Sequence, residues 1–298
     1  MAASGMSMDV DSGAWRGSAA AVATLTFDVD AETPVLAAGG RYSRHLTTMS
    51  HQAYGPDVGV PRILDLLDEL EVPATFFVPG WVAERRPHLA ASIVERGHEV
   101  AHHSYSHQTA TDMTEQAQRD DFERALSVFA SQDIEVSGYR AAMWQTTATT
   151  MELLAEHGLS YDSSMMADDR PYLLKLGDTD VVELPVHWSL DDWEQYAFLP
   201  EPFVGGLIEA PSKVFDMWRD ELEGMSAYGC LFNLCLHPFL TARPGRLAVV
   251  RRLIEWARER GDISFERCRD VAARVAEVGG VREVRPDRTE IDPDTYPD

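Results

Sequence analysis

The strongest constraint on the fold of this 298-residue chain is a repeat of an apolar run, a segment with helical periodicity and a glycine. Gly97, Gly158, Gly229 and Gly261 directly follow four helical segments, where a left-handed residue commonly ends a helix. Six segments have helical apolar spacing: 63–70, 81–96, 114–130, 147–157, 213–227 and 247–260. Six runs resemble strands: 21–27, 74–78, 99–101, 136–141, 181–188 and 231–236. This alternation predicts an α/β fold with a mainly parallel sheet, which we expect to form a distorted (β/α) barrel of about seven strands.

Polar side chains stand at the ends of five of the predicted strands. In a parallel barrel the carboxyl ends of the strands meet at one mouth, where active sites form. We therefore expect seven titratable side chains to face one cavity: Asp28, Asp30, His103, His107, Arg140, Asp162 and His237.

Two of these residues, His103 and His107, lie four positions apart in the sequence His-Ser-Tyr-Ser-His. Two imidazoles on one turn can bind a single metal ion from the same side, and Asp30 offers a third ligand. Such a pair alone is more often a coincidence of spacing, but here Asp28 stands beside Asp30 and a His-Pro pair follows at His237. Neutral imidazoles with one carboxylate favour Zn²⁺, and a similar ion such as Co²⁺ also fits.

Four short motifs within residues 24–240 resemble those of the polysaccharide deacetylases, which share the NodB homology fold and form carbohydrate esterase family 4. They are Thr-Phe-Asp-Val-Asp at 26–30, His-Ser-Tyr-Ser-His at 103–107, Gly-Tyr-Arg at 138–140 and Leu-His-Pro at 236–238. The resemblance implies that Asp28 is the catalytic base, Arg140 orients that base and His237 is the general acid. It also implies the metal ligands Asp30, His103 and His107.

The sequence departs from the family pattern at two places. Ala142 stands where the third motif normally has proline, so we expect a differently shaped loop up to Trp144. Val29 replaces the more common second aspartate of the first motif. Residues 184–192 resemble a branch without export signals, which includes peptidoglycan-deacetylase-like proteins and hydrolases of cyclic imides or ureides. Kinship of fold cannot choose between these substrates.

Three hypotheses of function follow. The first is a metal-dependent hydrolase of non-peptide C–N bonds that removes acetyl groups from N-acetylated sugars, and the second is a cyclic imide or ureide hydrolase on the same fold. The third is a catalytically silent binding protein that keeps the metal as a structural staple. The same donor types also occur in non-haem iron oxygenases, but the second carboxylate, Asp28, argues against that alternative.

Several polar and aromatic residues have ambiguous roles in the sequence. Asp162 could polarise His237 or bind its own turn, and both alternatives stay open. Trp144 is as consistent with the core as with a substrate wall. We expect Asp191 and Asp192 to lie in a solvated loop. The segment 39–59 has no clear periodicity and is a candidate flap over the mouth.

Composition limits the partners and the location. A formal net charge of −23 disfavours nucleic acid and anionic membranes, which bind clusters of Lys and Arg. We therefore expect a small-molecule or oligosaccharide substrate, and the resemblance favours a homo-oligomer. The sequence shows neither a signal-like start nor an 18-residue apolar stretch, which predicts a cytoplasmic protein. The expected division is an N-terminal extension at 1–20, one catalytic domain at 21–281 and an acidic tail at 282–298.

Overall fold

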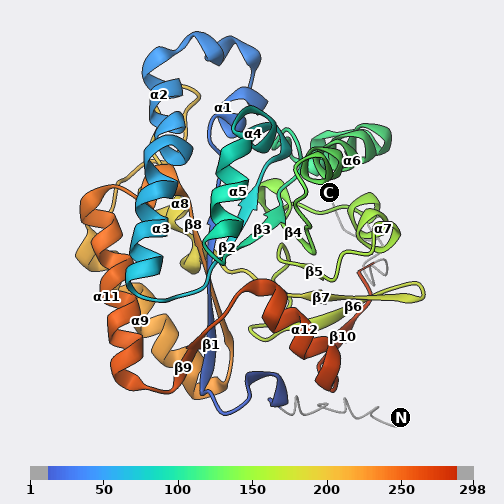
Figure 1. Ribbon diagram of the computed structural model, residues 1–298, viewed down its shortest axis with the longest axis vertical. Coiled ribbons are helices and arrows are strands. Elements are labelled where there is room, and N and C mark those ends of the chain that lie inside the picture. Colours follow the sequence, from blue (N-terminus) through green and yellow to red (C-terminus); the bar gives the residue numbers. More distant parts are fainter. Residues whose placement is uncertain (1–12, 287–298) are drawn as a thin grey trace, which may run out of the picture.

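A computed structural model describes residues 13–286, and β1 is the strand around which this part of the chain is built (Figure 1). It pairs with β8 along one edge and with β2 and β9 along the other, and every pairing in the sheet is parallel except that of β6 with β7. The strand order is β10-β6-β7-β5-β4-β3-β2-β1-β8, with β9 beside β1. The strands are β1 (Ala21–Asp28), β2 (Thr75–Val78), β3 (Glu99–His102), β4 (Gly138–Tyr139), β5 (Tyr161–Asp162), β6 (Tyr172–Leu176), β7 (Thr179–Glu183), β8 (Leu231–Leu236), β9 (Ile263–Phe265) and β10 (Glu283–Val284).

The predicted parallel α/β fold is confirmed, and the described residues form ten strands where about seven were expected. Of the four strands that no predicted run covers, β6 has five residues, β9 has three, and β5 and β10 have only two each. Periodicity cannot detect a strand of that length, because two residues do not define an alternation.

Helices cover the outside of the sheet, with α9 and α11 packed together and α6 and α7 on the other side of the view (Figure 1). They are α1 (Thr33–Ala37), α2 (Leu46–Tyr54), α3 (Val60–Glu69), α4 (Gly80–Arg85), α5 (Pro87–Glu95), α6 (Glu115–Ser131), α7 (Ala148–Glu156), α8 (Asp192–Tyr196), α9 (Pro211–Tyr228), α10 (Pro238–Thr241), α11 (Pro244–Arg260) and α12 (Cys268–Val278). None of the helices in the described part of the chain is long and apolar enough to cross a membrane.

The six predicted helices are present, and the four predicted cap glycines have positive φ angles between 65° and 83°. One predicted helix, 81–96, is divided into α4 and α5. The break falls at Arg86, whose φ of −131° is not helical, because the ring of Pro87 disfavours helical geometry in the preceding residue. The segment 39–59 is helical rather than irregular: it contains a 3-10 helix at Gly40–Arg44, then α2 and a π-helical turn at Gly55–Gly59.

Successive residues of β1 point to opposite sides of the sheet, although the whole strand is buried. Leu25 and Phe27 belong to the large apolar core beneath the outer helices. Thr26 and Asp28 point to the other side, where both contact the guanidinium group of Arg140. The face of the sheet that carries Thr26 and Asp28 is therefore polar at the end where the catalytic residues were predicted.

The described packing extends slightly beyond residues 21–281. Trp15 is fully buried and packs in an apolar cluster with Val271 and Val275 of α12. Glu283 and Val284 pair with β6. Residues 1–12 and 287–298, which make up most of the two predicted terminal segments, lie outside the described residues.

Candidate active site

Six of the seven predicted site residues lie together at the carboxyl ends of parallel strands. Five of them line one small cavity of about 40 Å³, and Arg140 holds one of the five, Asp28, from behind. Asp28 ends β1, and His103 and His237 directly follow β3 and β8. The cavity is lined by Asp28, Asp30, His103, His107, Met143, Trp144, Trp188, Asp191, Trp193, Glu194 and His237.

Asp30, His103 and His107 form a buried cluster whose ligand atoms lie within 4.8 Å of one another. His103 Nε2 is 3.3 Å from Asp30 Oδ1, and His107 Nε2 is 3.4 Å from Asp30 Oδ2. Burial alone would raise the pKa of Asp30, but the imidazoles of His107, His103 and His237 hold it well below its usual range. Asp30 is therefore a carboxylate, the form that binds a cation.

These three residues fit a divalent metal ion. Asp30 Oδ1 is buried and accepts no hydrogen bond among the described residues. A tetrahedral ion with ligands at about 2.0–2.1 Å keeps those ligand atoms roughly 3.3 Å apart, close to the observed spacing. His103 Nδ1 lies 2.7 Å from the Arg140 carbonyl oxygen, which can only accept a hydrogen bond, so Nδ1 carries the proton and Nε2 is free to bind the ion.

The loop that carries the two histidines is held by its own hydrogen bonds and by α6. Ser104 and His107 have positive φ angles of 57° and 58°, which is unusual for residues other than glycine. Asp121 of α6 accepts hydrogen bonds from the backbone N–H groups of Tyr105, at 2.7 Å, and Ser106, at 3.0 Å. The sequence pattern around the histidines did not reveal this role of Asp121.

Asp28 is fixed by two donors. Arg140 Nη1 donates to its Oδ1 at 2.7 Å, and the thiol of Cys235 donates to its Oδ2 at 3.4 Å. Arg140 is fully buried, and the nearby carboxylate of Asp28 raises its pKa against the opposing effect of burial. Arg140 follows Gly138, where a Cβ atom would overlap the ring of Tyr161. Only glycine therefore lets β4 and β5 approach closely enough to place this arginine.

His237 is supported by Asp192, and the prediction that Asp191 and Asp192 are solvated was wrong. Asp192 is fully buried and its Oδ1 accepts hydrogen bonds from His237 Nδ1 at 2.7 Å and from the His237 main-chain N–H at 2.9 Å. Burial opposes protonation of His237, but Asp192, Asp191 and Asp30 together raise its pKa to about 10. Sequence reasoning missed this because consecutive acidic residues before a short helix usually face water, and only the tertiary structure places α8 against β8.

Asp162 was expected either to polarise His237 or to bind its own turn. It does not contact His237, and it binds its own turn. Its Oδ1 accepts a hydrogen bond from Ser164 Oγ at 2.8 Å.

Trp144 is mostly buried and lines the cavity, with its ring stacked on Trp188 at a centroid distance of 4.6 Å. In the loop after Ala142, Met143 and Trp144 both have positive φ angles, 56° and 53°.

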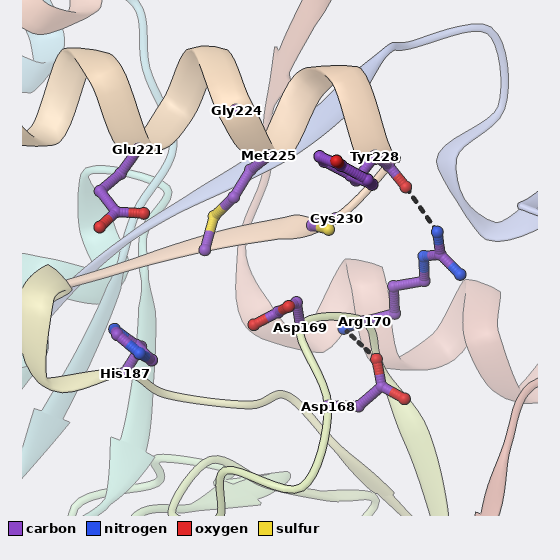
Figure 2. Close-up of a pocket in the computed structure, with 9 residues that line it drawn as sticks. All are labelled: Asp168, Asp169, Arg170, His187, Glu221, Gly224, Met225, Tyr228 and Cys230. Atoms are coloured by element: carbon purple, nitrogen blue, oxygen red, sulfur yellow. Dashed lines mark hydrogen bonds between the residues drawn. The ribbon is translucent and has the colours of Figure 1, made fainter.

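A roomier cavity of about 410 Å³ is lined by α9, residues 168–170, His187 and Cys230. Figure 2 shows Glu221, Asp169 and His187 around it, with Met225 and Cys230 on its wall. None of the seven predicted site residues lines it. The concentration of buried titratable groups, rather than volume, therefore marks the smaller cavity as the candidate active site.

The mouth of this parallel α/β sheet holds a buried set of three possible metal ligands, a fixed carboxylate and an imidazole supported by a carboxylate. These are the groups that a metal-assisted hydrolase needs. Comparisons with known proteins agree. Residues 53–161 match the family model described as polysaccharide deacetylase. A peptidoglycan deacetylase from Helicobacter pylori is 30% identical over 235 residues, which cover 70% of this chain and 80% of that protein.

Solved structures extend the likeness to nearly the whole chain. The crystal structure of a proposed polysaccharide deacetylase from Mycobacterium smegmatis is 42% identical, covers 92% of this chain and 96% of its own, and superposes with a TM-score of 0.88. An allantoinase, at 22% identity and a TM-score of 0.78, covers 90% of this chain and 94% of its own and shares the fold. The chain belongs to the polysaccharide deacetylase family, whose members hydrolyse C–N bonds other than peptide bonds.

Proposed function

We propose that the protein is a metal-dependent deacetylase of N-acetylated sugars. The observation that carries the proposal is the contact of Asp30 with three imidazoles in one buried mouth: His103, His107 and, at 3.5 Å, His237. The proposed metal ligands, the base Asp28 and the acid His237 thus surround one small cavity. Among the described residues, each other group that could hold a metal ion includes His237 of this same mouth.

Asp30, His103 and His107 would hold the ion, which the donor set predicts to be Zn²⁺ or Co²⁺. A bound ion of this kind lowers the pKa of a water ligand from about 15.7 to about 7 and polarises the substrate carbonyl. Asp28 Oδ2 faces the same space, 3.8 Å from His103 Nε2, and is placed to accept the proton of the attacking water. Arg140 and Cys235 keep that carboxylate in one orientation.

His237 then completes the hydrolysis as the general acid. Its Nδ1 is held by Asp192, so Nε2 points toward Asp30 and the cavity. The carboxylates around it favour the protonated imidazole, which donates a proton from Nε2 to the departing nitrogen. Without this proton the amine would leave as an anion, which is a far poorer leaving group.

The experiment loads the protein with Zn²⁺ or Co²⁺, adds N-acetylglucosamine oligomers and measures released acetate. We expect Asp28→Asn to keep the metal and to lose roughly 10²- to 10⁴-fold in kcat. Asp216→Asn, an exposed carboxylate on α9, is the matched control and should keep full activity. Acetate release by Asp28→Asn at the rate of the unchanged protein would contradict the assigned base, whereas absence of acetate release from the unchanged, metal-loaded protein would favour a silent binding protein.

The walls of the cavity favour a second candidate, hydrolysis of a cyclic imide or ureide. The free space is small, and the stacked rings of Trp144 and Trp188 form a flat wall beside the catalytic groups. Flat rings stack well on indoles, whereas a polymer needs an open groove. Succinimide, hydantoin and allantoin, assayed by ring opening with the same metal-loaded protein, separate the two candidates. Homo-oligomerisation and a cytoplasmic location stay predictions, which light scattering and cell fractionation would test.

A further inference from the structure

A pair of buried carboxyl groups lies beneath the active site and takes no part in the proposed hydrolysis. Asp162 of β5 and Glu183 of β7 are register partners in adjacent parallel strands, and both are fully buried. Asp162 Oδ2 and Glu183 Oε2 receive no hydrogen bond from any donor among the described residues. Two adjacent carboxylates cannot both ionise there at low cost, but one proton held between them makes one group the donor and the other the acceptor.

The surroundings offer no charge to replace that proton. Arg140 faces the pair from the end of β4, but its charge is already matched by Asp28 at 2.7 Å. The other titratable neighbours are Tyr139 of β4 and Tyr172 of β6, and burial, followed by the nearby carboxyl groups, raises the pKa of both phenols far above 10, so they stay neutral. Burial likewise raises the pKa of Asp162 to about 6 and that of Glu183 well above its usual range.

The pair holds the turn that follows β5. Glu183 Oε1 accepts hydrogen bonds from the main-chain N–H groups of Ser164, at 3.0 Å, and Met165, at 2.9 Å. Asp162 Oδ1 accepts the hydroxyl of Ser164 at 2.8 Å. Both carboxyl groups therefore bind the same turn, from two different strands.

The 163–165 turn also holds Arg140. The Ser163 carbonyl oxygen accepts a hydrogen bond from Arg140 Nε at 3.0 Å, and Ser163 Oγ accepts one from Nη2 at 2.9 Å. Ser164 Oγ accepts the Ala141 N–H at 2.9 Å, at the root of the loop that carries Trp144. A continuous set of buried hydrogen bonds thus connects Glu183 to Arg140, and Arg140 to Asp28.

We propose that Glu183 is a positioning residue: it shares one proton with Asp162, and the pair keeps the 163–165 turn, and hence Arg140, in place behind Asp28. The inference rests on the proposed function in so far as Arg140 and Asp28 serve hydrolysis. A second ionisation of the pair would place two like charges on the turn and displace it. Glu183→Gln mimics the protonated group, because the amide oxygen accepts the same two N–H groups and the amide nitrogen donates to Asp162.

The test compares Glu183→Ala with Glu183→Gln in the metal-loaded full chain on N-acetylglucosamine oligomers. We expect Glu183→Ala to lower kcat by roughly 10- to 100-fold with little change in KM, because Arg140 and Asp28 are misplaced. Glu183→Gln should restore most of that loss. The ratio of kcat for Glu183→Gln to that of the unchanged protein should rise from pH 7 to pH 10, since only the unchanged protein can lose the shared proton.

Glu99→Ala is the matched control, because Glu99 is also a fully buried carboxyl group but binds Thr75 and Tyr161 instead of the 163–165 turn. It should lose stability and keep kcat. Full kcat in Glu183→Ala, or a ratio that does not change with pH, would overturn the proposal. If Glu183→Ala does not fold, the pH-dependent ratio of the glutamine variant decides.

A readout without substrate separates this proposal from the proposed function. Crystal structures of Glu183→Gln and of Glu183→Ala, or of Asp162→Ala if the former does not crystallise, should show the contact of Arg140 with Asp28 kept in the first and broken in the second. Absence of acetate release from the unchanged protein would contradict deacetylation while leaving this structural result to stand. An Arg140 that keeps its place without the carboxyl group would overturn the positioning role even in a working deacetylase.

Discussion

Asp192 accepts two hydrogen bonds from His237, one from Nδ1 at 2.7 Å and one from the main-chain N–H at 2.9 Å. The same carboxylate also accepts the hydroxyl of Thr241, one turn further along. A single buried side chain from α8 therefore sets the tautomer, the orientation and the charge of the proposed general acid.

Replacement of Asp192 by asparagine should weaken the acid without removing the metal. The amide lacks the negative charge that favours protonated His237, so we expect kcat to fall by about 10- to 100-fold with an unchanged metal content. Acetate release and elemental analysis of the same sample provide the two measurements. Asp220→Asn, an exposed carboxylate on α9, should leave both unchanged; an equal loss in that control would show that the effect is not specific to His237.

Removal of the metal should lower the stability of the folded chain, because Asp30, His103 and His107 bind the ion only when the chain is folded. An ion that binds only the folded chain stabilises it by about 2.7 kcal/mol when its concentration is 100 times Kd. Thermal unfolding with Zn²⁺ and with a chelator should therefore differ for the unchanged protein and not for His107→Ala. His88→Ala, an exposed histidine on α5, serves as the control and should retain the shift. A shift that persists in His107→Ala would place the ion elsewhere.

The buried ion pair of Arg140 with Asp28 predicts a strongly non-additive pair of substitutions. Arg140→Met leaves Asp28 as an uncompensated buried charge, and we expect a loss of about 3–5 kcal/mol in the free energy of unfolding. In the double variant with Asp28→Asn that charge is gone. Its loss in the free energy of unfolding should therefore be smaller than the sum of the two single losses by roughly 0.5–3 kcal/mol. Urea unfolding of all four proteins measures the cycle. Additive losses would mean that Arg140 does not compensate Asp28.

The Asp162 and Glu183 pair predicts how stability depends on pH. Both groups have a higher pKa in the folded chain than their usual values, so their contribution is fully present at low pH and is lost as pH rises through the folded pKa values. Above about pH 5 the unfolded chain has released both protons while the folded chain keeps at least one. The free energy of unfolding should therefore fall by about 1 kcal/mol per pH unit from this pair between roughly pH 5 and 7.

Glu183→Gln should remove much of that slope, because the amide does not titrate. Urea unfolding of the unchanged protein and of Glu183→Gln at several pH values in this range measures the difference. Parallel curves for the two proteins would show that no proton is held at the pair.

The sequence by itself determined the parallel α/β class, six helices, four glycine caps and the residues that gather at the mouth. These features are local: helical periodicity, a residue that must adopt a positive φ, and a polar side chain directly after a buried strand each leave a mark within a few residues. The His-Ser-Tyr-Ser-His spacing and the Asp-x-Asp that precedes it are of this kind. Asp30, His103 and His107 could therefore be named as a set from the sequence alone.

Only the tertiary structure decided which acidic residues support that set. No sequence pattern marks Asp192, Asp121 or Glu183 as a partner of that set. In the structure Asp192 and Glu183 are fully buried, and all three accept hydrogen bonds from another segment. Asp162 shows the converse, since it stands at the end of a strand near the other site residues but binds its own turn and Glu183. Whether a carboxyl group is solvated or is the partner of a catalytic residue depends on which strands are neighbours, and that follows from packing of the whole chain.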